Sequence, residues 1–119
     1  MQSPNVELES RNAVLTRVVS LLAACAYEEV VATAPKSRIT AAQMRAAVGA
    51  YGRSLIPLPP HASALIDYVA IAGANPEAWS VVVPLFTREE GRSDLSLVAQ
   101  MTRTADGQYE VEVDDIHVL

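Results

Sequence analysis

The chain has 119 residues, half of them hydrophobic, and a formal net charge of −5 at pH 7. This length and composition predict a single domain, residues 1–119, that can bury a core without a disulfide or a metal. Residues 61–119 hold three basic and ten acidic side chains, a net of −7, which disfavours nucleic-acid binding because phosphates require basic patches.

The first residues and the single cysteine bear on the compartment. The start of the chain lacks the basic region of a signal peptide, and the longest apolar stretch, residues 13–27, is interrupted by Arg17 and is too short to span a bilayer. Cys25 cannot form a disulfide within the chain, and its apolar neighbours predict a buried thiol. We therefore expect a cytoplasmic protein without a membrane partner.

The first half of the chain shows helical periodicity. Apolar residues recur at three- and four-residue spacing over residues 6–33, and Pro35 ends this segment because it lacks an amide proton. A second helix is expected to begin at Thr40, where Gln43 stands at the spacing of a capping box, and to end near Gly52.

A proline-rich connector, residues 56–60, separates the helical half, residues 1–55, from a β-rich half, residues 61–119. Proline excludes this connector from the interior of a helix or of a central strand. Residues 65–72 predict a strand, with a short helix as the alternative, and residues 73–76 have the composition of a turn.

The remaining sequence has the period of β-strands. Residues 79–86 and 95–103 predict two strands, and Pro84 indicates an edge position or a bulge in the first. An Asp-Gly pair at 106–107 predicts a hairpin turn, after which residues 109–114 alternate between apolar and acidic. The predicted fold is therefore α+β, with two N-terminal helices packed on one face of a three- or four-stranded antiparallel β-meander.

The sequence contains no pattern that indicates catalysis. His61 and His117 are distant in sequence, and no G-x-S-x-G elbow presents a serine nucleophile, so both histidines are expected to be structural or exposed. Asp114, Asp115 and His117 could offer metal ligands, but alternate strand residues point to opposite faces and no Cys/His cluster has zinc spacing. We expect no catalytic residues, no metal and no cofactor.

Acidic residues gather in two places in the second half. The charged connection at residues 87–94 is either a solvated loop whose charges pair locally or an acidic knob flanked by arginines that recognise a partner. A row of carboxylates near the end of the chain is the solvent-exposed side of a strand, and it could also dock a basic partner. The predicted partner-binding residues are Glu89, Glu90, Arg92, Asp94, Glu110, Glu112, Asp114 and Asp115.

Residues 79–97, WSVVVPLFTREEGRSDLSL, and the ending DDIHVL at 114–119 carry a resemblance. They resemble a family of small bacterial proteins of unknown function with the signature W-x-V-x-V-P-L-aromatic-T-x-E-E-G-R-S-D-L, from about residue 65 onward. This resemblance implies no established activity. In being small, acidic and without catalytic motifs, the chain is also similar to immunity proteins of bacterial toxin systems, including contact-dependent growth inhibition.

These observations predict a non-enzymatic protein-binding module, an immunity protein that binds and neutralises a basic, co-encoded toxin domain. Two other classes of function are alternatives. One is a small-ligand-binding protein or enzyme with a pocket between sheet and helices near His61 or Asp67. The other is an accessory subunit that self-associates through an edge strand near Pro84.

Overall fold

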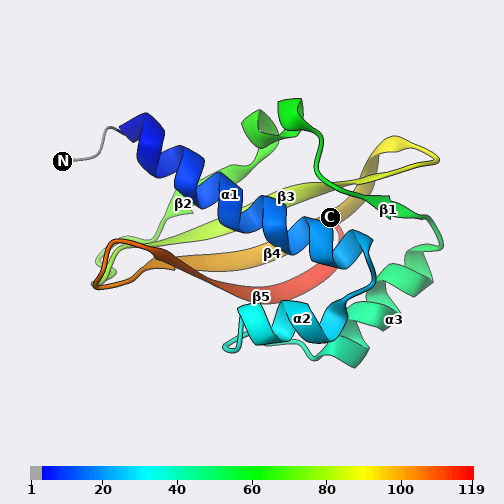
Figure 1. Ribbon diagram of the computed structural model, residues 1–119, viewed down its shortest axis with the longest axis horizontal. Helices are drawn as coiled ribbons and strands as arrows, with labels where there is room; N and C mark the ends of the chain where they lie inside the picture. The colour runs from blue at the N-terminus through cyan, green and yellow to red at the C-terminus, as the bar shows by residue number, and fades with distance from the viewer. Residues whose placement is uncertain (1–3) are drawn as a thin grey trace.

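Helices precede an antiparallel sheet in the computed structural model, which describes residues 4–119 (Figure 1). The helical elements are α1 (Pro4–Ala23), α2 (Tyr27–Thr33), α3 (Ala41–Tyr51) and the 3-10 helix η1 (Pro60–Leu65). The strands are β1 (Leu55–Ile56), β2 (Asp67–Ala70), β3 (Ala78–Thr87), β4 (Gly91–Arg103) and β5 (Tyr109–Val118). The predicted α+β class is confirmed.

The sheet has five strands rather than three or four. β3, β4 and β5 form the predicted antiparallel meander, and β3 is also paired, on its other side, by both β2 and β1. β3 is therefore a central strand, so of the two alternatives predicted for Pro84 the edge position does not hold. β2 pairs with residues 79–82 and β1 with residues 86–87, so Pro84, which has no amide proton, falls in the gap between them. The predicted bulge is present, as a register shift between Pro84 and Phe86.

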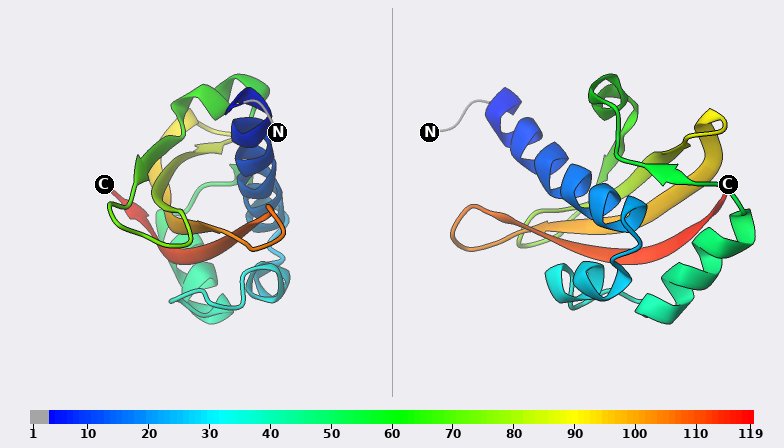
Figure 2. Two further views of the ribbon diagram at one scale, coloured as in Figure 1. Left: turned by 90° about the vertical axis from the view of Figure 1, so that its left-hand side faces the viewer. Right: turned by 45° about the vertical axis from the view of Figure 1, so that its right-hand side comes forward.

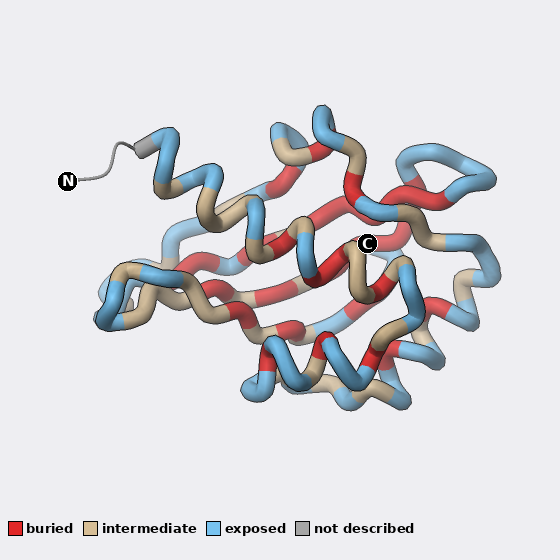
Figure 3. Tube along the Cα trace, in the orientation of Figure 1, coloured by how far each residue is buried: buried red, intermediate tan, exposed pale blue. Residues whose placement is uncertain are grey.

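Of the helices in residues 4–119, α1 lies across the sheet, α3 packs beside β5, and α2 packs against both α1 and α3 (Figures 1 and 2). Four side chains of α1 are at most 1% exposed, namely Leu15, Val18, Val19 and Leu22. They belong to the same core cluster as the inward-facing residues of β3, β4 and β5, and the buried positions follow the sheet face beneath α1 (Figure 3). No helix in the described part of the chain, residues 4–119, lies on the opposite face of the sheet (Figure 2).

The long helix predicted over residues 6–33 is interrupted between α1 and α2. Cys25 has a φ of 59°, in the left-handed region, where a right-handed helix cannot continue. The amide of Ala26 donates to the carbonyl of Leu21 and the amide of Cys25 to that of Leu22, the two bonds of a Schellman ending. The thiol is exposed, so the prediction of a buried Cys25 is wrong, because the residue lies in this turn and not on the apolar stripe.

The second predicted helix is confirmed at both ends as α3. The Thr40 side chain accepts a hydrogen bond from the Gln43 amide, and the Gln43 side chain accepts one from the Thr40 amide, which completes the capping box. Gly52 ends the helix with a φ of 75°, a conformation that favours glycine. This helix end positions the loop between β3 and β4, as described below.

The first turns of α1 are attached to the sheet by an arginine among aromatic rings. The guanidinium carbon of Arg11 lies 4.4 Å from the ring centroid of Trp79 and 5.0 Å from that of Tyr68. The Tyr68 hydroxyl donates a hydrogen bond of 2.6 Å to Asn12, and burial raises the pKa of Tyr68 to about 12. Cation–π contacts of this kind stabilise the docked helix.

Candidate partner-binding surface

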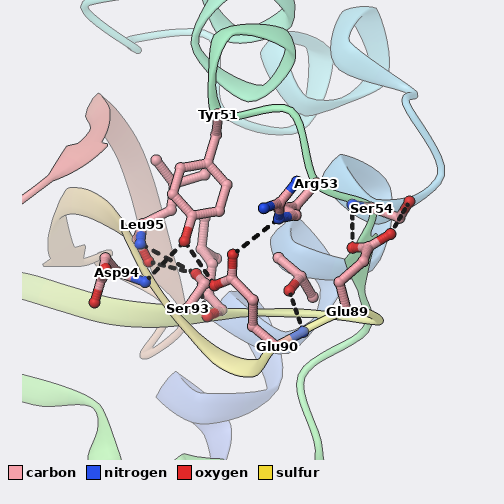
Figure 4. Close-up of polar contacts among 10 residues, drawn as sticks. Tyr51, Arg53, Ser54, Glu89, Glu90, Ser93, Asp94 and Leu95 are labelled. Atoms are coloured by element: carbon pink, nitrogen blue, oxygen red, sulfur yellow. Dashed lines mark hydrogen bonds and ion pairs between the residues drawn. The ribbon is translucent and has the colours of Figure 1, made fainter.

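The charged connection between β3 and β4 is shorter than the sequence indicates and is tied to the end of α3 (Figure 4). β3 extends to Thr87 and β4 starts at Gly91, so only residues 88–90 lie outside the strands. The carboxylate of Glu89 accepts hydrogen bonds from the amide and the hydroxyl of Ser54, at 2.8 and 2.9 Å. Hydrogen bonds from the Ser54 backbone and then from its side chain lower the pKa of Glu89, because they stabilise the ionised form.

Glu90 connects the same loop to the last turn of α3. Its carboxylate accepts a hydrogen bond of 2.7 Å from the Tyr51 hydroxyl and lies 3.3 Å from Nε of Arg53. The Tyr51 hydroxyl in turn accepts a hydrogen bond of 3.1 Å from the backbone amide of Asp94. The loop is therefore held in one position by side chains from a distant part of the sequence.

The four predicted binding residues of this region thus have different roles. Glu89 and Glu90 make contacts that hold the loop, although both are exposed. Arg92 and Asp94 are exposed in β4, and within residues 4–119 neither side chain has a hydrogen-bond or ion-pair partner. Asp94 is therefore the carboxylate of this region that is free to contact another molecule.

Glu110 and Glu112 point away from the core, as the alternation of β5 predicts, but basic side chains of the helical half cover them. Lys36 lies 3.4 Å from Glu110, and Arg38 lies 3.2 Å from Glu112. The amide of Arg38 donates a hydrogen bond of 2.8 Å to the carbonyl of Val113, which holds this segment along β5. Each of these two carboxylates therefore has a basic partner within the chain.

A bulge decides which of the last residues of β5 face solvent. Asp115 and Val113 stand opposite residues 98 and 99 of β4, which are neighbours, so Asp114 is the extra residue. One extra residue shifts the inward and outward alternation by one position. Ile116 is therefore buried and Asp115 exposed, whereas a regular strand would place them the other way round.

Asp114, at the bulge, lies between opposite and like charges. Its Oδ1 is 3.5 Å from Nε of Arg38. Burial, followed by hydrogen bonding with Glu112 and the like charge of Glu112, raises the pKa of Asp114 to about 6. Below this pH the carboxyl pair carries one negative charge less.

Asp115 and His117 form a pair on the exposed side of β5. Oδ2 of Asp115 lies 2.8 Å from Nδ1 of His117, and its other oxygen accepts a hydrogen bond of 2.8 Å from the Ile116 amide. Their side chains keep 53% and 43% of their exposure. Between residues 4 and 119, no three His, Cys, Asp or Glu side chains gather in a way that could hold a metal ion.

The uncovered face of the sheet brings apolar and acidic side chains together. We define the outer face by two neighbouring rows of cross-strand pairs, Asp67–Val82–Val98–Asp115 and Val69–Ser80–Gln100–Glu112. In the first row two partly exposed valines lie at the centre and exposed carboxylates lie at both ends. Sequence reasoning missed the valines of these rows. Strand alternation predicts that these valines lie on the sheet face opposite the buried residues. Only the register between strands shows that they stand next to one another in a row.

The structure also shows an open cleft of about 310 Å³ between α3 and the ends of β4 and β5. It lies away from the two residues near which a pocket was predicted. His61 packs edge-on against Phe86, with ring centroids 5.8 Å apart, and Asp67 lies on the outer face. The cleft and the outer face are therefore candidate binding surfaces.

Fold and surface together define a small α+β protein in which α1 lies across one face of the sheet and no helix of residues 4–119 lies on the other. Residues 19–119 match a domain of unknown function, DUF7668, and the chain belongs to this family. No curated protein and no solved structure matches the chain. The match includes α2 and α3, and so covers more than the segment from about residue 65 that carried the resemblance. Leu15 and Val18 precede the match but are fully buried, so the folding unit begins before it.

No helix formed by residues 4–119 is both long enough and apolar enough to cross a membrane.

Proposed function

We propose that this chain is a non-enzymatic protein-binding module that docks a basic protein on its outer face. The row Asp67–Val82–Val98–Asp115 is the observation that carries this proposal. It has an apolar centre and a charged rim, the arrangement found in protein–protein interfaces. The proposed interface is centred on the strands and not on the β3–β4 loop.

The charges around the outer face favour a basic partner. Arg38 and Lys36 compensate the carboxylates beside β5, whereas Asp67, Asp94 and Asp115 have no lysine or arginine partner among the described residues. Complementary charge at the rim of an interface accelerates association and selects the partner. A basic surface would therefore be attracted to the two ends of the valine row.

The more specific form of the proposal is an immunity protein that neutralises a co-encoded toxin domain, as in contact-dependent growth inhibition. Its support is the net charge of −7 over residues 61–119, three basic against ten acidic side chains, and the similarity of overall character to such proteins. A nuclease-type toxin would present a basic surface of the kind required, because it must bind phosphates. A cytoplasmic location is part of this proposal.

The test uses the protein encoded by the gene next to this one. We expect its C-terminal domain to arrest growth when expressed alone and this chain to restore growth when both are expressed. The double variant Asp67→Arg with Asp115→Arg should bind that domain at least about a hundredfold more weakly by calorimetry, since charge reversal opposes a basic surface. Glu29→Arg is the matched control, because it reverses one exposed carboxylate on α2, away from the outer face.

Three outcomes distinguish the interface on the outer face from the immunity role. Loss of affinity in the double variant, with an unchanged thermal midpoint, supports the outer face as the interface. Binding that depends on the outer face without any growth arrest would leave the binding module standing and remove the immunity role. Equal affinity of the wild-type chain and the double variant would overturn the interface proposal.

A further inference from the structure

The cleft beside α3 has an apolar lining that is left open by small side chains. Ala47 and Ala50, three residues apart on α3, form one wall, and Leu95, Ile116 and Val118 form the other. Val118 keeps 54% of its exposure, so the apolar surface continues to the rim. A volume of about 310 Å³ is large enough for one leucine or phenylalanine side chain and lies at the small end of ligand pockets.

Residues that carry exposed carboxylates adjoin both ends of this lining. The Tyr51 ring closes one end, and its hydroxyl is bound to the backbone amide of Asp94, whose own side chain is exposed and unpaired within residues 4–119. At the other end the lining residue His117 is bound to Asp115. A positive charge next to an inserted apolar group would therefore find a carboxylate on either side.

The cleft and the outer face meet at the edge strand β5. By strand alternation Leu95, Ile116 and Val118 face the inner side of the sheet, whereas the outer face lies on the other side. His117 lines the cleft, and it also pairs across strands with Ser96. Ser96 lies two residues before Val98 on the same face of β4. A partner seated on the valine row would thus reach the cleft with a part of its chain that passes around the edge of β5.

We propose that the cleft receives one large apolar side chain from a basic segment of the partner protein. This inference rests on the proposed function and specifies the partner's chemistry, an aromatic or aliphatic residue flanked by lysines or arginines. Interfaces concentrate their binding energy in such an anchor when it fills a desolvated pocket. The carboxylates of Asp94 and Asp115 select the flanking charge.

The first experiment uses the full chain labelled with ¹⁵N and three synthetic peptides. One peptide has a phenylalanine between two pairs of lysines, the second has serine in place of phenylalanine, and the third has glutamates in place of lysines. We expect the first to shift the amide signals of Ala47, Ala50 and Val118 and to bind at least about tenfold more tightly than the other two. If the glutamate peptide or the serine peptide bound as tightly as the lysine-flanked phenylalanine peptide, the inference would be overturned.

The second experiment fills the cleft. Ala50→Phe places a ring in the opening at an exposed helix position and should weaken binding of the lysine-flanked peptide at least about tenfold. Ala42→Phe, at an exposed position of α3 that does not line the cleft, is the matched control and should bind normally. Ala50→Leu serves as a second, smaller filling variant, and a thermal unfolding midpoint measured for each variant tests whether it folds.

The same variants separate this inference from the proposed function. If Ala50→Phe and Ala50→Leu bind the neighbour-encoded domain normally while Asp67→Arg with Asp115→Arg does not, the cleft inference fails and the outer-face proposal stands. If the lysine-flanked peptide binds in the cleft but the neighbour-encoded domain does not bind the chain at all, the proposed function fails. Weaker binding of that domain by both kinds of variant supports the two together.

Discussion

Replacing Asp114 by asparagine should make the protein more stable at neutral pH. The residue sits at the bulge of β5, where burial and the neighbouring Glu112 raise its pKa from 3.8 to about 6. The folded chain therefore holds this proton more tightly than the unfolded chain does. The contribution of Asp114 to the unfolding free energy therefore decreases as the pH rises from about 4 to about 6. Asparagine is neutral throughout and avoids this loss.

The size of the effect follows from the pKa and the exposure of the side chain. The gap between a pKa of about 6 and the ordinary 3.8 corresponds to about 3 kcal/mol, at 1.36 kcal/mol for each pKa unit. The Asp114 side chain keeps 26% of its exposure, and screening by solvent and the lost attraction to Arg38 reduce the expected gain to about 1–2 kcal/mol at pH 7. Near pH 4 the variant and the wild-type chain should be equally stable.

Urea unfolding followed by tryptophan fluorescence measures this difference. Trp79 is the only tryptophan and is 8% exposed, so its emission reports loss of the core. Asp67→Asn is the control, since it removes an exposed carboxylate of the outer face. A difference between Asp114→Asn and the wild-type chain that stays constant from pH 4 to pH 7, or a variant that is less stable at pH 7, would refute the reasoning.

Four further substitutions test the packing and the turns. Leu15→Ala should lower the unfolding free energy, measured in urea, by about 3 kcal/mol, because this side chain is fully buried between α1 and the sheet although it lies before the family match. An unchanged unfolding free energy would show that α1 is not part of the folding unit. Arg11→Met should cost about 1–2 kcal/mol and change the emission of Trp79, on which the guanidinium rests, whereas unchanged emission would contradict that contact. Cys25→Gly should raise the unfolding free energy by about 1 kcal/mol, since glycine adopts a φ of 59° without strain, and a less stable variant would argue against the left-handed turn. Glu89→Gln should lower the thermal midpoint at pH 7 and lose this effect in acid, because the lowered pKa stabilises the fold only while the carboxylate is ionised; an effect independent of pH would contradict this.

Local chemistry in the sequence determined several elements directly. The capping box of Thr40 and Gln43, the helix end at Gly52 and the alternation before the bulge of β5 are all encoded by residues close together in the chain. The α+β class followed from the change of period between the two halves. The inward position of Val111 and the outward position of Glu112 needed no knowledge of neighbouring strands.

The candidate surface depended on contacts that join distant parts of the sequence. Side chains of the α3–β1 region, among them Ser54, bind the acidic residues of the β3–β4 loop, and Arg38 covers part of the carboxylate row of β5. No local sequence pattern predicts these pairs. The sequence therefore identified the acidic residues but could not show which of them have a partner within the chain and which are free. Their role in binding stays a prediction.

Sequence alone therefore determined the ends of α3, the alternation of β5 before its bulge and the accumulation of acidic charge in the second half. Tertiary structure alone decided why Pro84 is tolerated in a central strand and how the bulge at Asp114 exposes Asp115. The physical reason is the range of the interactions. Helix caps and strand alternation are satisfied within a few residues, whereas strand register, bulges and charge pairing depend on which distant backbone and side-chain groups the folded chain brings into contact.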